Sequence, residues 1–137
     1  MINTMIYRSF TDLTPSDSAY QHILVRAWTR NQNLDVTGYL HWEDGIFHQW
    51  IEGPPAELLI VEQIILADSM HRDVTILNRS EVTAREFEGF SMAVGMSENS
   101  PLFNFMAERG APNNDHLAYA HSVLQFMKHQ LSQAVLH

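Results

Sequence analysis

The sequence predicts an α+β domain with a ferredoxin-like order of elements, β-α-β-β-α-β-β, in one mixed five-stranded sheet. Apolar residues alternate in residues 2–10 and 36–52, which is typical of strands. They recur at spacings of three and four in residues 19–28 and 58–65, which is typical of helices. Beyond residue 100 the same helical spacing appears twice more. We therefore expect two helices on one face of the sheet and two C-terminal helices on the other.

Length and composition exclude several classes of function. At 137 residues the chain forms one domain, and its formal net charge of −8 argues against binding to nucleic acid or to anionic lipid. It has no cysteine, which excludes disulfides and thiolate metal sites. It has no apolar run long enough for a membrane span and no signal peptide. A cytoplasmic protein without membrane or nucleic-acid partners is the expectation.

The first strand and helix follow from residues 2–33. Alternation over residues 2–10 places Met5, Tyr7 and Ser9 on one face of a strand. Ser16 is the expected N-cap of a helix that ends near Asn31. The apolar stripe of this helix comprises Ala19, Tyr20, Ile23, Leu24, Ala27 and Trp28.

A hairpin is predicted at Asp44-Gly45, because both central residues of a type I′ turn need positive φ. Counting outward from this turn pairs Glu43 with Ile46 and Leu40 with Gln49. Gln49 then shares a face with Leu40, Trp42, Phe47 and Ile51, whereas the other face carries Tyr39, His41, Glu43, Ile46, His48 and Trp50. An amide on an apolar face must be hydrogen-bonded, or it costs about 1–3 kcal/mol.

The second half of the chain supplies the remaining elements. We expect a helix over residues 55–67, a polar loop over 68–73, a short strand over 74–77, a connection over 83–89 and a last strand over 90–95. The inward side of the helix is predicted to comprise Leu58, Val61, Ile64, Ile65 and Leu59.

The C-terminal region is expected to contain a short helix over 100–108 and a longer one beyond 112. The apolar stripe of the longer helix comprises Leu117, Ala120, Val123, Leu124, Met127, Leu131 and Val135. These helices should cover Tyr39, Ile46 and Trp50. Residues 1–97 would form the domain proper, and residues 98–137 an extension packed on the sheet.

Tyr7 and Gln49 are the first candidates for a site. If the first strand neighbours the strand of Gln49, a phenol and an amide converge beneath the two helices. They form either a satisfied polar pair in the core or a site for a planar ligand, to which Asn31 could add a second amide. His41 and His48 face each other across the hairpin and could hold a metal, but Glu43 is the only carboxylate near them, and two ligands on a strand pair are more often a chance arrangement. No metal is expected.

The sequence resembles the BLUF domains, which are flavin-binding blue-light sensors. The resemblance covers about residues 2–96 and rests on several blocks in the right order and spacing. The blocks are Met5–Ser9, Asn31, Val36–Leu40, Phe47–Pro54, Asp68, His71–Val74 and Ala84–Met92. Beyond residue 97 the chain is similar to short BLUF proteins only in having two helices.

The resemblance implies a role for each matching residue. Tyr7 would give an electron and a proton to the photoexcited flavin, and Gln49 would bridge this phenol to the flavin and rearrange its hydrogen bonds in the light, by rotation or tautomerisation. Asn31 would hold the pyrimidine side of the ring. Ile23 and Ile65 would sandwich the ring, His71 would lie near the ribityl chain, and Met92 would lie near Gln49.

Two positions depart from the family pattern. Phe90 stands where the family often has Trp, so predictions that depend on the indole do not carry over. Met70 stands where a relative with Arg could bond a phosphate, which leaves Arg72 as the candidate replacement. FAD is the expected cofactor, with FMN and riboflavin as alternatives.

The resemblance implies a blue-light photoreceptor that is not an enzyme. It would signal to a separate partner protein through the C-terminal helices or through the interface of a homo-oligomer. The alternative is a ferredoxin-like regulatory module that binds a small molecule or a protein without photochemistry. A small hydrolase of the acylphosphatase type would need an anion-binding loop that the sequence lacks.

Overall fold

The computed structural model describes residues 1–97, 101–110 and 115–135, so the boundary predicted between residues 97 and 98 falls at the edge of a described range. The elements in chain order are β1 (Ile2–Phe10), α1 (Ser18–Asn33), β2 (Thr37–Glu43), β3 (Ile46–Gly53), α2 (Pro55–Ala67), β4 (Arg72–Val82), β5 (Ala93–Ser97), α3 (Pro101–Arg109) and α4 (His116–Val135). Within these ranges no helix is both long enough and apolar enough to cross a membrane.

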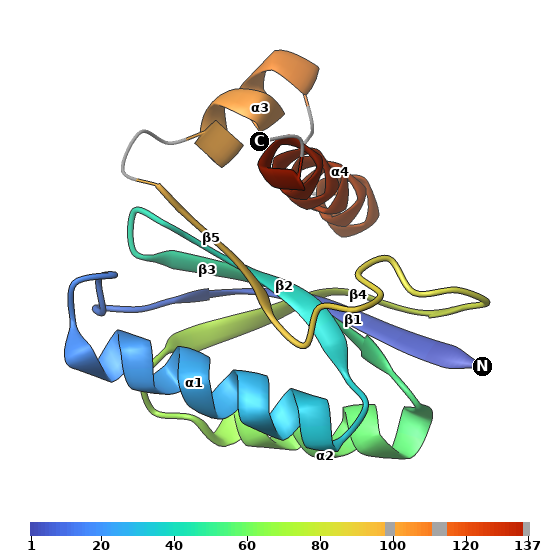
Figure 1. Ribbon diagram of the computed structural model, residues 1–137. Helices are drawn as coiled ribbons and strands as arrows, with labels where there is room; N and C mark the ends of the chain where they lie inside the picture. Colours follow the sequence, from blue (N-terminus) through green and yellow to red (C-terminus); the bar gives the residue numbers. More distant parts are fainter. Residues whose placement is uncertain (98–100, 111–114, 136–137) are drawn as a thin grey trace.

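The five strands form one mixed sheet in the order β4-β1-β3-β2-β5. Neighbouring strands are antiparallel except for β2 and β5, which run parallel. Helices α1 and α2 cover one face of the sheet, and α3 and α4 lie over the other (Figure 1). The predicted ferredoxin-like α+β fold, with its extra strand, is confirmed.

The β2–β3 hairpin has the predicted register, with Glu43 opposite Ile46 and Leu40 opposite Gln49. Asp44 and Gly45 have φ values of 51° and 77°, as a type I′ turn requires. The two faces of the hairpin therefore carry the predicted residues, and they pack into separate hydrophobic clusters: one on the face of Tyr39 and Trp50, and two on the face of Leu40 and Ile51.

Both faces of the sheet are covered by apolar side chains. The face toward α1 and α2 forms two clusters, in which Leu40 packs with Tyr20 of α1, and Ile51 with Leu58 and Val61 of α2. The opposite face packs Tyr39 and Trp50 against α3 and α4. The most deeply buried residues of α4 are Val123, Phe126 and Met127. Burial of each such side chain contributes about 1.5–3 kcal/mol, so the C-terminal helices belong to the core.

Two carboxylates of the hairpin hold later segments in place. Glu43 accepts hydrogen bonds from the backbone N–H groups of Leu102 (2.8 Å) and Phe103 (3.0 Å), and thereby caps the start of α3. Glu52 accepts bonds from the N–H groups of Glu86 and Phe87, both at 2.8 Å, which fixes the connection between β4 and β5. Both glutamates are buried, and both are satisfied by these donors.

Several predicted boundaries were wrong. The N-cap of α1 is Asp17 rather than Ser16, and the Asp17 carboxylate accepts its bond from the N–H of Thr14 (2.8 Å), outside the helix. Strand β4 is much longer than residues 74–77, because it pairs with β1 along nearly its whole length. Strand β5 begins at Ala93, because Phe90 is held in a turn by the bond from its N–H to the Phe87 carbonyl (3.1 Å).

Some residues of the predicted apolar stripes face outward. Trp28, Leu59, Ile64 and Leu117 are each more than two-fifths exposed. Helix α2 is apolar on nearly all sides, so periodicity could not single out its inward face. The side chain of Val135 lies outside the described residues.

Candidate functional site

A cleft of about 480 Å³ lies between α1, α2 and the sheet. Tyr7 of β1 and Gln49 of β3 form its floor side by side, because the register of these two strands places them directly opposite each other. The other lining residues come from both helices, from the sheet and from the loop after α2. They are Ile23, Arg26, Ala27, Arg30, Leu40, Phe47, Ile64, Ile65, Ala67, Asp68, Met70 and His71.

The floor of the cleft contains a short hydrogen bond. The Tyr7 hydroxyl donates to Oε1 of Gln49 at 2.5 Å, and both side chains are buried. Nε2 of Gln49 has only a weak acceptor, the Sδ atom of Met92 at 3.6 Å. Burial raises the pKa of Tyr7, and the charge of Asp68 adds to this effect while that of Arg30 opposes it. The phenol therefore carries its proton at neutral pH.

His71 closes the cleft beside Tyr7. One ring nitrogen, Nδ1, lies 2.7 Å from the Ser9 hydroxyl, and Nε2 lies 2.7 Å from the Ile65 carbonyl. The Ile65 carbonyl can only accept, so the proton of this hydrogen bond lies on Nε2. The ring meets Tyr7 edge-on, with the two centroids 5.8 Å apart. His71 thus joins β1, α2 and the cleft.

Of the predicted site residues, the structure brings Tyr7, Ile23, Gln49, Ile65 and His71 together around the cleft. It does not bring Asn31, Met92 or Arg72 to the lining. Asn31 is fully buried; its Nδ2 donates to the Ser91 carbonyl at 3.0 Å, and its Oδ1 accepts from Arg30 Nε at 3.2 Å. Asn31 therefore ties α1 to the residue that precedes Met92.

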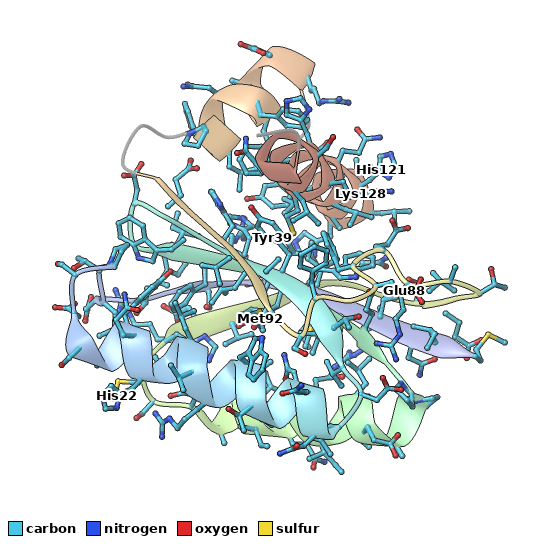
Figure 2. All side chains as sticks on the ribbon, in the orientation of Figure 1. His22, Tyr39, Glu88, Met92, His121 and Lys128 are labelled. Atoms are coloured by element: carbon cyan, nitrogen blue, oxygen red, sulfur yellow. The ribbon has the colours of Figure 1, made fainter. Side chains whose placement is uncertain are left out.

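Met92 reaches the site from the other side of Gln49. Figure 2 shows it on the face of the sheet that α1 covers, while Tyr39 lies on the face toward α4. Arg72 lies outside the cleft, with its guanidinium 3.1 Å from the carboxylate of Asp12 at the surface. The expectation that Arg72 replaces the missing arginine at position 70 has no support in this geometry.

Sequence reasoning missed two charged residues of the lining, Arg26 and Arg30. They follow Ile23 at helical spacings of three and seven, so the position of Ile23 on α1 already contained the signal. Burial lowers the pKa of Arg30, and the charges of Tyr7 and Asp68 oppose this shift. Asp68 is the acidic residue among the lining residues, and its Oδ1 accepts a bond from the N–H of Met70 (2.9 Å).

The residues present fit a flat aromatic ligand with one polar edge. Ile23 and Ala27 on α1 and Ile65 on α2 offer apolar walls, and the amide of Gln49 has a donor without a strong acceptor. The two histidines of the hairpin are engaged elsewhere, His41 with Glu43 and His48 with the Tyr119 hydroxyl, both at 2.8 Å. In the described ranges no three His, Asp or Glu side chains gather as metal ligands do.

Fold and cleft together define a class: a ferredoxin-like domain whose cleft between two helices suits a planar ligand. The family model for BLUF, described as sensors of blue light using FAD, matches residues 2–93. The chain belongs to the BLUF family, whose members bind a flavin.

Individual relatives agree with this assignment. The blue light- and temperature-regulated antirepressor BluF of Escherichia coli (strain K12) is 26% identical over 131 residues, which cover 93% of this chain. The match takes up 32% of that relative, so this chain spans about a third of its length.

Two solved structures share the fold. The dark-state structure of BlrB, a BLUF protein, has a TM-score of 0.74 at 24% identity, and the match covers 90% of this chain and 96% of BlrB. The BLUF domain of BlrP1 has a TM-score of 0.69 at 26% identity, over 93% of this chain and 90% of that domain.

Proposed function

We propose that this chain is a blue-light photoreceptor that holds FAD in the cleft between α1 and α2 and senses light through Tyr7 and Gln49. The observation that carries the proposal is the buried hydrogen bond from the Tyr7 hydroxyl to Gln49 Oε1, on the floor of a cleft with apolar helical walls. Ile23 and Ile65 would flank the ring, and His71 would close the cleft beside Tyr7.

A bound flavin supplies absorption of blue light and, once excited, an acceptor for one electron. Tyr7 is the donor in this proposal. Its raised pKa keeps the proton on the phenol in the dark. Loss of an electron makes a phenol strongly acidic, and Gln49 Oε1, at 2.5 Å, is in position to accept the proton that Tyr7 releases.

Gln49 converts this proton movement into a structural change. An amide can exchange its donor and acceptor ends, by rotation or by tautomerisation. Either change alters what Gln49 presents to Met92, whose sulfur now accepts from Nε2 at 3.6 Å. Because Met92 directly precedes β5, the change reaches the strand that pairs with β2.

The output in this proposal is a protein contact rather than a reaction. Strand β2 ends at Glu43, which caps α3, so a shift of β5 and β2 reaches the C-terminal helices. The relative from Escherichia coli is an antirepressor, which supports a separate protein partner for this chain too. A homo-oligomer interface on the same helices is the second route for the signal.

The variant Gln49→Leu tests the role of the amide. We expect it to retain flavin but to lose the small red shift of the flavin absorption band after blue light, because leucine has no group that can exchange hydrogen bonds. Gln63→Leu is the matched control, since Gln63 is exposed on α2. A normal red shift in Gln49→Leu contradicts the assignment.

Tyr7→Phe tests the donor in the same assay. The variant keeps the ring and lacks the hydroxyl, so we expect bound flavin without the light-induced shift. Tyr39→Phe removes a hydroxyl on the opposite face of the sheet and should cycle normally. A protein that binds no flavin at all would favour the alternative, a ferredoxin-like regulatory module without photochemistry.

A further inference from the structure

The positively charged side chains of this chain divide into two groups by their partners. Four of the eight Lys and Arg residues form ion pairs with carboxylates: Arg72 with Asp12, Arg79 with Glu62, Arg85 with Asp35 and Lys128 with Glu86. Two lie over aromatic rings: Arg8 over Tyr119 and Arg109 over Phe105. Among the described residues, the remaining two, Arg26 and Arg30, form no ion pair and lie over no aromatic ring, although the charge of Asp68 acts on Arg30.

Both unpaired arginines line the same cleft. Arg26 and Arg30 are four residues apart on α1, which places them one above the other on one face of the helix. Arg30 donates Nε to the neutral amide of Asn31 and retains its two terminal nitrogens, whereas Arg26 is exposed and has no hydrogen-bond partner in the described ranges. In a chain with 16 acidic residues and 8 basic ones, two neighbouring arginines that share a cleft with one carboxylate, Asp68, and form no ion pair indicate a place for an anion that is not part of the chain.

The charged residues that line the cleft give it a net positive charge, which favours the binding of an anion. Arg26 and Arg30 outnumber Asp68 among its lining residues, and the Asp68 carboxylate is already bonded to the backbone of Met70. Guanidinium groups match phosphate oxygens in geometry and form charge-assisted bonds with them. Arg72, which the sequence analysis named as the candidate to bind a phosphate, forms an ion pair with Asp12 outside the cleft.

We propose that Arg26 and Arg30 bind the phosphate of the cofactor's ribityl tail, so that the cleft selects FMN or FAD over riboflavin. The inference rests on the proposed function, because it assigns the anion to a flavin whose ring lies between α1 and α2. It replaces Arg72 by two arginines of α1 as the phosphate-binding residues. It also explains how a BLUF domain with Met70 in place of an arginine retains a cationic site.

Binding of riboflavin, FMN and FAD to the flavin-free 137-residue chain tests the proposal, with quenching of flavin fluorescence as the measurement. Riboflavin has the same ring and ribityl chain as FMN but no phosphate. We expect FMN and FAD to bind at least about tenfold more tightly than riboflavin, as a charge-assisted hydrogen bond implies. Added salt should reduce this difference in affinity, because it weakens the binding of FMN and FAD but not that of riboflavin.

The variants Arg26→Gln, Arg30→Gln and their combination locate the effect. These variants should bind FMN and FAD more weakly than the wild type does, and their affinity for riboflavin should be nearly unchanged. Arg72→Gln should keep the wild-type difference in affinity between riboflavin and the two phosphorylated flavins. Equal affinity of the wild type for riboflavin and FMN would overturn this inference alone. The inference would also be overturned if the difference in affinity between FMN and riboflavin remained in the double variant, or if it disappeared in Arg72→Gln. Failure of all three flavins to bind would overturn the proposed function and this inference with it.

Discussion

His48 lies next to Gln49 in β3 but points to the opposite face of the sheet, where its Nε2 meets the Tyr119 hydroxyl of α4 at 2.8 Å. Burial lowers the pKa of His48 from 6.5 to about 3, and the nearby charges of His41 and Arg8 add to the effect. The imidazole is therefore neutral in the folded protein. Adjacent residues of one strand thus contact the cleft and the C-terminal helices.

This shift predicts a loss of stability in acid. Between pH 6.5 and about 3 the unfolded chain binds a proton at His48 that the folded chain does not. The free energy of unfolding therefore falls as the pH falls, by about 1.4 kcal/mol per pH unit for one such group. Because burial also lowers the pKa of His41, part of the slope should remain after His48 is replaced.

Urea unfolding at pH values on both sides of 6.5 measures this effect. His48→Gln should flatten the dependence of the unfolding free energy on pH, whereas His22→Gln, at an exposed position of α1, should not change it. An equally steep loss of stability in His48→Gln would show that His48 is not responsible.

The sequence predicted Tyr7 and Gln49 on the floor of the cleft, but it did not predict the two arginines of α1 that line the cleft. Alternation and the Asp44-Gly45 turn placed Gln49 on an apolar face, and Tyr7 became its partner once β1 was set beside β3. The position of Arg72 was not predictable in this way. A long side chain can pair with any of several residues that lie close to it in the fold. Arg72 pairs with Asp12, which is distant in sequence, and this contact places its guanidinium outside the cleft.

Helix α3 depends at its first turn on a residue from another element. The Glu43 carboxylate, at the end of β2, accepts both Leu102 and Phe103 N–H groups and also contacts His41 Nε2 at 2.8 Å. No local sequence pattern predicts a cap of this kind, because the accepting carboxylate of Glu43 lies 59 residues away from Leu102 in the sequence. The same dependence on distant partners explains why β4 exceeded its predicted length beside β1.

Glu43→Ala should therefore loosen α3. We expect a destabilisation of about 1–3 kcal/mol, since the change removes a cap and leaves buried donors without an acceptor. Hydrogen exchange of the Leu102 and Phe103 amides should accelerate by more than that of the α4 core. Asp115→Ala, which removes the exposed carboxylate that accepts from Ala118 N–H (3.1 Å) at the start of α4, is the control and should leave α3 unchanged. Unaltered exchange at Leu102 and Phe103 in Glu43→Ala would contradict the assignment of the cap.

The whole molecule is a sheet between two helical layers, and β3 contacts both (Figure 1). This arrangement was predictable, because both faces of the hairpin are rich in aromatic residues and two helices cannot cover two faces. The cations of the cleft were harder to predict, since their role appears only when the partners of the other six Lys and Arg residues are known.

In the proposed function, the cleft above Tyr7 and Gln49 makes this chain a blue-light sensor. The most direct test is the absorbance spectrum of the purified 137-residue chain, supplied with FAD, before and after blue light. We predict a flavin band that shifts slightly to the red in the light and returns in the dark. A bound flavin whose spectrum does not change on illumination, or a chain that binds no flavin, would contradict the claim.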